Sequence, residues 1–223
     1  MQVEIRRTIY NKNSLTQFVT RVTFVTIITN LGAMEMNFFQ GIVKGFMTRS
    51  TWPRALLWLV ASETVYFIML GVTIPSIEDK AIGMRILDLK TTGYSSSYVT
   101  SFLERIGSEG RHNYLIHQIP LDMIYPSLMA VTGALFIALL TRKINPRLGV
   151  LMMIPFFGAI FDYLENITVV EMLLSYPSLP QGITRVASLF TIMKTVLDTL
   201  YLGVLGVLFL ISIFKIVRSP QKK

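Results

Sequence analysis

The chain of 223 residues contains no cysteine and only two histidines. Without cysteine, a disulfide framework, a thiolate-bound metal, an iron–sulfur cluster and a cysteine nucleophile are all excluded. His112 and His117 are five positions apart, which separates them by about 140° around a helix, so a metal shared between them is not expected. The sequence therefore indicates no metal and no other cofactor.

Charge is also scarce. Charged residues make up 15% of the chain, whereas hydrophobic residues make up 52% and the mean hydropathy is +0.55. The apolar runs are longer than the core of a water-soluble protein requires, so we predict an integral membrane protein. The net charge of +8 comes from basic residues that flank the apolar runs, as Arg54, Arg147 and Lys215 do. This distribution indicates membrane topology, and nucleic acid is not an expected partner.

Long apolar segments define the predicted architecture, because a helix needs about 20 residues to cross the hydrocarbon layer. The connector "TRKINPRL" and the tail 218–223 are basic, whereas the loop 78–118 balances five acidic residues against five Lys and Arg residues. Basic connectors favour the inner side, so both chain ends should lie inside. We predict an all-α, polytopic four-helix transmembrane bundle, N-in and C-in, with spans at 54–77, 119–141, 148–175 and 186–217.

The outer loop should contain a short helix. In "SSSYVTSFLERIG" the serines 95–97 are suitable N-caps, the apolar residues fall on one face, and Gly107 is a stop signal. We therefore predict a helix between Ser96 and Ile106 that covers the outer end of the bundle.

The first part of the chain is predicted to lie outside the bundle. Residues 1–35 are rich in threonine and β-branched residues and contain Arg21, so they should form a poorly ordered lead and no span. A start codon assigned too early explains this lead, and an organellar targeting segment is the alternative. Residues 36–53 have apolar residues at helical spacing, which predicts an amphipathic helix on the inner membrane surface or, as an alternative, an ordinary packing helix.

Polar residues interrupt the third predicted span, where "PFFGAIFDYLENITVV" contains Asp162, Glu165 and Asn166 on one helix face. At a rise of about 1.5 Å per residue, Lys194 and Asp198 of the fourth span lie at the same depths. A charged group facing lipid at mid-membrane costs about 2.5 to 3.5 kcal/mol on insertion scales. We therefore expect these polar stripes to face one another inside the bundle.

The intramembrane charges are unbalanced. Lys194 is outnumbered by five acids, which are Glu63, Asp122, Asp162, Glu165 and Asp198. Because desolvation and repulsion favour a neutral carboxyl group, we expect one or more of these acids to hold a proton at neutral pH. Asp162 and Glu165 are candidate catalytic acid and base, with Lys194 as their electrostatic partner. The candidate substrate-binding residues are Arg111, Tyr114, Asp122, Asn166, Asp198, Glu63 and Tyr125, with Arg111 as a gate that reaches a carboxylate or a lipid head group.

Short motifs suggest a family. "EGRHNY" before "LDMIYP", then "FDYLEN" in the next helix and a lysine in the last, resembles an uncharacterised family of four-helix integral membrane proteins found mainly in bacteria. The resemblance covers roughly residues 93 to 200. It implies the same architecture and a bacterial inner membrane, with an organellar membrane as the alternative, and it implies no particular reaction.

Three functions remain open at this stage. The first is binding or modification of a small lipophilic molecule in a buried acid and lysine pocket. The alternative is a non-catalytic accessory subunit of a larger membrane complex or homo-oligomer, in which the polar residues only join helices. A proton-coupled carrier is disfavoured, because four helices without broken spans or an inverted repeat make a poor transporter. Membrane lipids are expected partners in each case, and Gly203 and Gly206 are expected to allow close helix packing.

Overall fold

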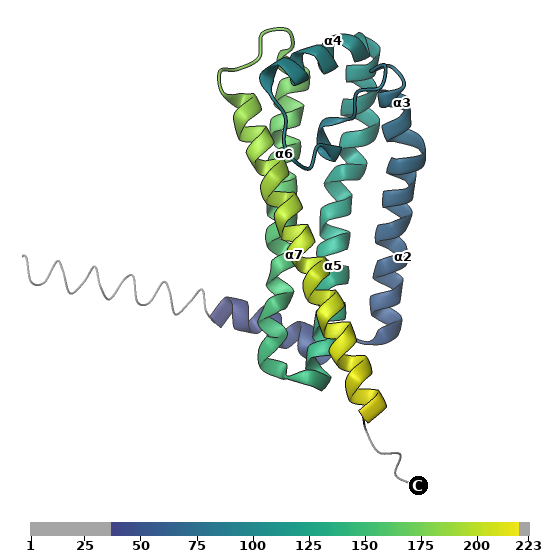
Figure 1. The fold of residues 1–223 in the computed structure, drawn as a ribbon, viewed down its shortest axis with the longest axis vertical. Helices are drawn as coiled ribbons and strands as arrows, with labels where there is room; N and C mark the ends of the chain where they lie inside the picture. The colour runs from purple at the N-terminus through teal and green to yellow at the C-terminus, as the bar shows by residue number, and fades with distance from the viewer. Residues whose placement is uncertain (1–36, 219–223) are drawn as a thin grey trace, which may run out of the picture. The chain divides into compact units, whose positions relative to one another are not determined.

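The computed structural model describes residues 37–218 (Figure 1). It divides into two compact units, residues 1–45 and residues 46–223. Of the first unit only residues 37–45 are described, and they belong to a helix that extends to residue 49. The predicted surface position of the segment 36–53 stays a prediction, while the lead 1–35 and the tail beyond Arg218 lie outside the described residues.

The second unit is built from helices, and no strand occurs between residues 37 and 218. Four helical stretches are long and apolar enough to cross a membrane, so the chain is an integral membrane protein. The all-α four-helix bundle predicted from the sequence is confirmed. Its elements are α2 (Trp52–Ile68), η1 (Met69–Thr73), α3 (Ile74–Glu78), η2 (Leu87–Leu89), α4 (Ser96–Asn113), η3 (Tyr114–Gln118), α5 (Ile119–Ile144), η4 (Pro146–Met152), α6 (Met153–Ser175) and α7 (Ile183–Arg218).

The helical stretches that are long and apolar enough to cross a membrane coincide with the predicted spans. The stretches Trp52–Glu78, Pro146–Ser175 and Ile183–Arg218 begin and end within three residues of the predicted bounds. The second predicted span, 119–141, lies within a longer helical stretch, Ser96–Ile144. Hydropathy locates the spans well because the backbone polar groups of a membrane segment have to bond within the helix itself.

The predicted short helix is present as the first part of α4. The Ser95 side chain caps it by accepting a hydrogen bond of 3.2 Å from the Tyr98 amide. Gly107 interrupts the helix with φ of 65° and ψ of −173°, a conformation that favours glycine. The helix then resumes and runs through η3 into α5, so Gly107 marks a break and not the end of the helical stretch.

The segment between α3 and α4 folds back into the bundle (Figure 1). Ala81, Ile86 and Leu87 are fully buried, and they pack against the buried face of α4, which includes Phe102 and Leu103. The Tyr94 amide donates to the Ser188 hydroxyl of α7 at 2.9 Å, which fixes the end of the segment. We call residues 79–95 the re-entrant loop. The short helix was predicted for this region, whereas the inserted loop was not.

Two π-helical turns, η1 and η3, lie side by side in the bundle. Each precedes a proline, Pro75 or Pro120, whose ring would clash with the carbonyl four residues earlier in an α-helix. That carbonyl belongs to residue 71 or residue 116, so the wider turn relieves the clash. The turns are joined by Gln118, which accepts a hydrogen bond from the Thr73 hydroxyl and donates to Met69 Sδ at 3.5 Å.

The far end of α7 departs from expectation. A Cβ atom built at Gly203 or at Gly206 would meet no atom of the described chain within 4 Å. Large apolar side chains in this part of α7, such as Phe209 and Phe214, are more than half exposed. The prediction that these glycines serve close packing against another helix of this chain is therefore wrong, because both face open space, although Lys215 near the end of α7 still donates to the carbonyls of Lys143 and Ile144 in α5.

Candidate functional site

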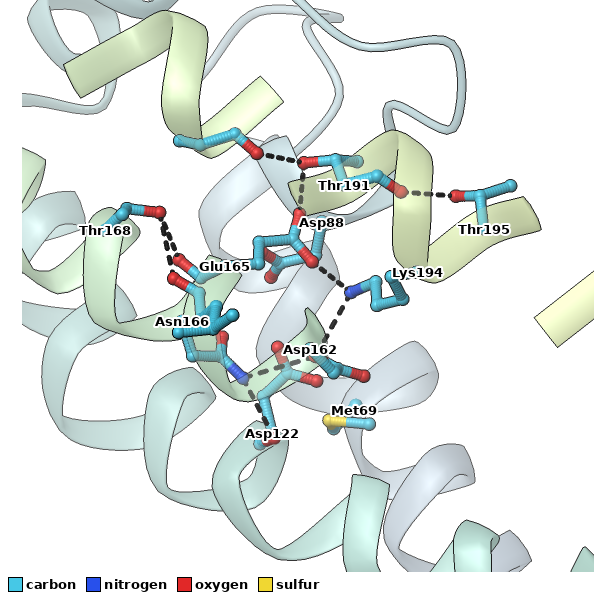
Figure 2. Close-up of polar contacts among 12 residues, drawn as sticks. Met69, Asp88, Asp122, Asp162, Glu165, Asn166, Thr168, Thr191, Lys194 and Thr195 are labelled. Atoms are coloured by element: carbon cyan, nitrogen blue, oxygen red, sulfur yellow. Dashed lines mark hydrogen bonds and ion pairs between the residues drawn. The ribbon is translucent and has the colours of Figure 1, made fainter. Parts of the chain in front are cut away.

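The polar stripes of α6 and α7 meet in the bundle, as the spacing predicted (Figure 2). Lys194 Nζ donates to Asp162 Oδ1 at 3.2 Å and also forms an ion pair with Glu165 Oε2. All three side chains are buried, and Glu165 is completely inaccessible. The candidate acid, base and electrostatic partner are therefore in direct contact.

Neighbouring polar groups hold these carboxylates in place. The Thr191 hydroxyl, one turn before Lys194, donates to Glu165 Oε1 at 2.5 Å. The Asn166 amide donates to the Asp122 backbone carbonyl at 3.0 Å and, more weakly, to Asp162 Oδ1 at 3.4 Å. Asn166 thus joins α5 to α6 beside the ion pairs.

A fourth carboxylate comes from the re-entrant loop. Asp88 in η2 is 9% exposed, and its Oδ1 accepts a hydrogen bond of 3.0 Å from the hydroxyl of Tyr114, which is completely buried. Burial raises the pKa of Asp88 from 3.8 to about 6, although the charge of Lys194 and the bond from Tyr114 act in the opposite direction. Figure 2 shows Asp88 beside Glu165 and Lys194.

Sequence reasoning missed Asp88 because it counted this residue among the charges of a solvent-exposed loop. A signal was present in the chain, since "ILDL" surrounds a single acid with apolar residues inside an otherwise polar connector. Such a pattern indicates a buried segment whose acid requires a partner inside the fold. Tyr94, nearer to α4, enters the same region, and its hydroxyl oxygen lies 3.5 Å from the Thr191 hydroxyl oxygen.

We define the acid–lysine cluster as Asp88, Asp122, Asp162, Glu165 and Lys194. In it four buried carboxyl groups surround a single lysine, as counted over the described residues (Figure 2). Apart from Glu165 Oε2, which is paired with Lys194, three buried oxygens have no hydrogen-bond donor within the described part of the chain, namely Asp88 Oδ2, Asp122 Oδ2 and Asn166 Oδ1. Buried polar atoms in native proteins are nearly always bonded, so this cluster is short of donors.

Chemically, such a cluster can hold protons or accept hydrogen bonds from the donor groups of a bound molecule. It does not have the arrangement of a metal site, since no group of three or more His, Asp or Glu residues between 37 and 218 is placed to hold a metal ion.

Asp198 and Tyr125 lie next to the acid–lysine cluster but outside its hydrogen bonds. Asp198 packs against α6 at Gly158, where a Cβ atom would come within 2.7 Å of its Oδ1. Gly158 is one turn from Asp162, so Asp198 continues the polar stripe away from the α4 end. Tyr125 stacks on Tyr66 of α2 with a ring separation of 5.4 Å.

Arg111 contacts a backbone carbonyl and an aromatic ring. Its Nη1 donates to the Leu103 carbonyl at 2.8 Å, and its guanidinium lies over the Tyr176 ring at 4.4 Å. The break at Gly107 leaves carbonyls at the end of the first part of α4 without helical donors, and Arg111 supplies one. Arg111 forms no ion pair with a carboxyl group between residues 37 and 218, so the first predicted contact is absent there, while the contact with a lipid head group stays a prediction.

Glu63 belongs to another region, a groove of about 400 Å³ between α2, α5 and α7. Leu59, Met129, Phe136, Tyr201 and Phe209 contribute to its walls. A second groove of about 320 Å³ lies where α5 and α7 end, and Trp52, Lys143 and Lys215 are among its lining residues.

Comparison of the chain with protein-family models, with curated proteins and with solved structures gives no match. The resemblance carried by "EGRHNY" and "FDYLEN" therefore stays a prediction, and the function has to be argued from the geometry.

Proposed function

We propose that this membrane protein binds a small lipophilic molecule and holds its donor groups in the acid–lysine cluster. The observation that carries the proposal is the set of three buried oxygens, on Asp88, Asp122 and Asn166, that no protein donor reaches within the described chain. A hydroxyl or amine group of a ligand would supply the missing donors. A molecule that is otherwise apolar suits a site enclosed by membrane-spanning helices.

The ion pairs within the cluster suit it to acid–base chemistry on such a molecule. Lys194 contacts both Asp162 and Glu165 and can stabilise either one as an anion. A neutral carboxyl group next to an ionised one is an arrangement that can donate and accept a proton in turn. Asp162 and Glu165 therefore remain the candidate catalytic residues of this proposal, with Asp122, Asn166 and Tyr114 as binding residues.

Co-purification tests the proposal directly. The protein is solubilised in a mild detergent, and the bound small molecules are extracted and identified by mass spectrometry. Asp162→Asn keeps the shape of the side chain, so we expect an intact fold and the loss of one lipophilic species. Glu171→Gln is the matched control, because Glu171 is an exposed carboxylate on the same helix and its variant should retain that species.

The same extracts decide against the proposal if the wild type, Asp162→Asn and Glu171→Gln carry identical sets of molecules. The accessory-subunit function would then be preferred. It is favoured by the exposed C-terminal half of α7, where Gly203 and Gly206 leave room for a helix of another protein. Cross-linking from this face in native membranes would identify that partner.

A further inference from the structure

The groove at Glu63 is separate from the acid–lysine cluster. Its volume of about 400 Å³ is within the range of small-molecule sites, roughly 300 to 1,000 Å³. Glu63 is the eleventh residue after Trp52, which places it about 17 Å along α2 and near the middle of the membrane-spanning part. The surrounding walls are mainly apolar, from Leu59, Leu140, Leu202 and Leu205.

The polar neighbours of Glu63 in the groove give it no partner. The Ser62 hydroxyl donates to the Leu59 carbonyl at 3.0 Å, and the Thr132 hydroxyl donates to the Leu128 carbonyl at 2.8 Å. Both hydroxyl protons are thus used within their own helices. Glu63 also forms no ion pair with any residue between 37 and 218. A carboxyl group at mid-membrane is therefore left without a cation from the described chain.

Aromatic rings complete the groove. Phe136 and Phe209 line it together with Tyr201, whose ring packs so closely on α5 that a Cβ atom at Gly133 would come within 2.5 Å of it. Ring faces attract cations, and the attraction strengthens away from water. The groove thus combines a carboxylate, aromatic walls and an apolar surface, which together are complementary to a positively charged group on a hydrocarbon chain.

We infer that this groove binds a lipophilic amine, with the ammonium group paired to Glu63 and the hydrocarbon chain lying along α2 and α7. Pairing would offset the cost of a charge at this depth, about 2.5 to 3.5 kcal/mol on insertion scales. A single carboxylate with apolar neighbours matches one ammonium group better than a metal ion, which requires several oxygen ligands. The site is independent of the acid–lysine cluster and of the function proposed for it.

Amide coupling tests this inference with dodecylamine as the probe. In the detergent-solubilised protein a hydrophobic carbodiimide activates Glu63, the nearby amine nitrogen attacks the activated carboxyl carbon, and the carbodiimide leaves as a urea. Peptide mapping by mass spectrometry should find the dodecylamide on Glu63. Dodecyltrimethylammonium, which cannot form an amide, should compete and lower the yield on the order of tenfold at tenfold excess over its dissociation constant. Dodecanol should not compete.

Matched glycine variants keep the test independent of folding defects at Glu63. Gly206→Phe should fill the groove and abolish the coupling, since Gly206 lines the groove and a Cβ there meets no described atom within 4 Å. Gly203→Phe should leave it unchanged, because Gly203 is equally uncrowded but does not line the groove. Equal competition by dodecanol, equal coupling at the exposed Glu171, or coupling that survives Gly206→Phe would each overturn the inference.

Discussion

The acid–lysine cluster and the Glu63 groove bury the same chemical group in different ways. In the cluster the carboxyl groups lie between tightly packed helices, share Lys194, receive protein hydrogen bonds and are covered by the re-entrant loop. In the groove a single carboxyl group faces apolar and aromatic side chains and has no partner within residues 37–218. An intramembrane oxygen with an internal partner thus contributes to stability, whereas one without such a partner is available for recognition. Removing Lys194, the shared partner in the cluster, should therefore affect folding, whereas changing Glu63 in the groove should affect binding.

The prediction with the largest effect concerns the orientation of the bundle, that is, which side of the membrane each of its ends faces. The chain lacks cysteine, so single cysteines can be placed at the exposed positions Ser108, within α4, and Asn145, at the opposite end. An impermeant thiol reagent applied to intact cells should label the first and leave the second unlabelled. Labelling of position 145 alone would show that the predicted orientation is inverted.

Removing the lysine of the cluster should have the next largest effect. Lys194→Met leaves the buried carboxylates without their cation, and we expect a loss of about 3 to 5 kcal/mol in the free energy of unfolding. Adding Asp162→Asn should recover about 0.5 to 3 kcal/mol of that loss through coupling. Unfolding in mixed detergent micelles measures both, with Glu63→Gln as a control expected to change stability by less than about 0.5 kcal/mol.

If Lys194→Met proves harmless, or its effect simply adds to that of Asp162→Asn, the ion pairs do not hold the cluster together. A large loss in the free energy of unfolding for Glu63→Gln would also contradict the proposed difference, because it would show that the groove carboxylate has an internal partner.

The docking of the re-entrant loop should depend on pH through Asp88. The pKa of Asp88 is raised on folding, from 3.8 to about 6, so the folded state favours the protonated carboxyl group. The resulting contribution to the free energy of unfolding is fully present below pH 3.8 and is lost as the pH rises through about 6. The full difference corresponds to about 3 kcal/mol. The titratable groups that interact with Asp88 are Lys194, Asp162, Glu165, Asp122, Tyr114 and Tyr94.

Hydrogen exchange of the amides of residues 86–89 measures this effect between pH 4.5 and pH 7.5, after correction for the intrinsic exchange rate. Protection should be greater at the lower pH in the wild type and nearly independent of pH in Asp88→Asn. A wild-type loop that becomes less protected at pH 4.5 would contradict the sign of the prediction.

The smallest expected effect is at the helix break. Arg111→Met removes the donor of the Leu103 carbonyl and should weaken the first part of α4 by about 1 to 2 kcal/mol. Local hydrogen exchange in residues 96–106 measures it, with Arg105→Met as an exposed control on the same helix. Equal loosening by both variants would mean that Arg111 acts only through its general charge.

The sequence predicts the parts of the structure that depend on short-range patterns. Span positions follow from hydropathy, and the Ser95 cap and the Gly107 break follow from local preferences. Counting residues along the helices also brought Asp162, Glu165 and Lys194 to one depth, and these three are in contact. For these three residues, the depth along the helix and the helix face were sufficient to predict the contact, because α6 and α7 are adjacent and antiparallel.

The missed features depend on long-range packing. Depth along a helix does not fix its rotation, so Glu63 was grouped with the other acids although it lines a separate groove. Asp88 was missed because no local pattern shows that a connector folds back into the bundle. The contact of Arg111 with the Leu103 carbonyl was not predicted, because that carbonyl becomes available only when Gly107 interrupts α4.

The π-helical turn η1 has a consequence for the alignment of this chain with any relative. A π turn contains about one residue more than an α turn, so α2 and α3 are out of phase with a continuous α-helix by about 100°. Deleting one residue of η1, such as Gly71, should restore that phase and rotate Glu63 away from the groove. A relative that lacks the extra residue would need a one-position gap between residues 69 and 73. Without that gap, an alignment anchored on Pro75 would pair Glu63 with a residue that faces another direction.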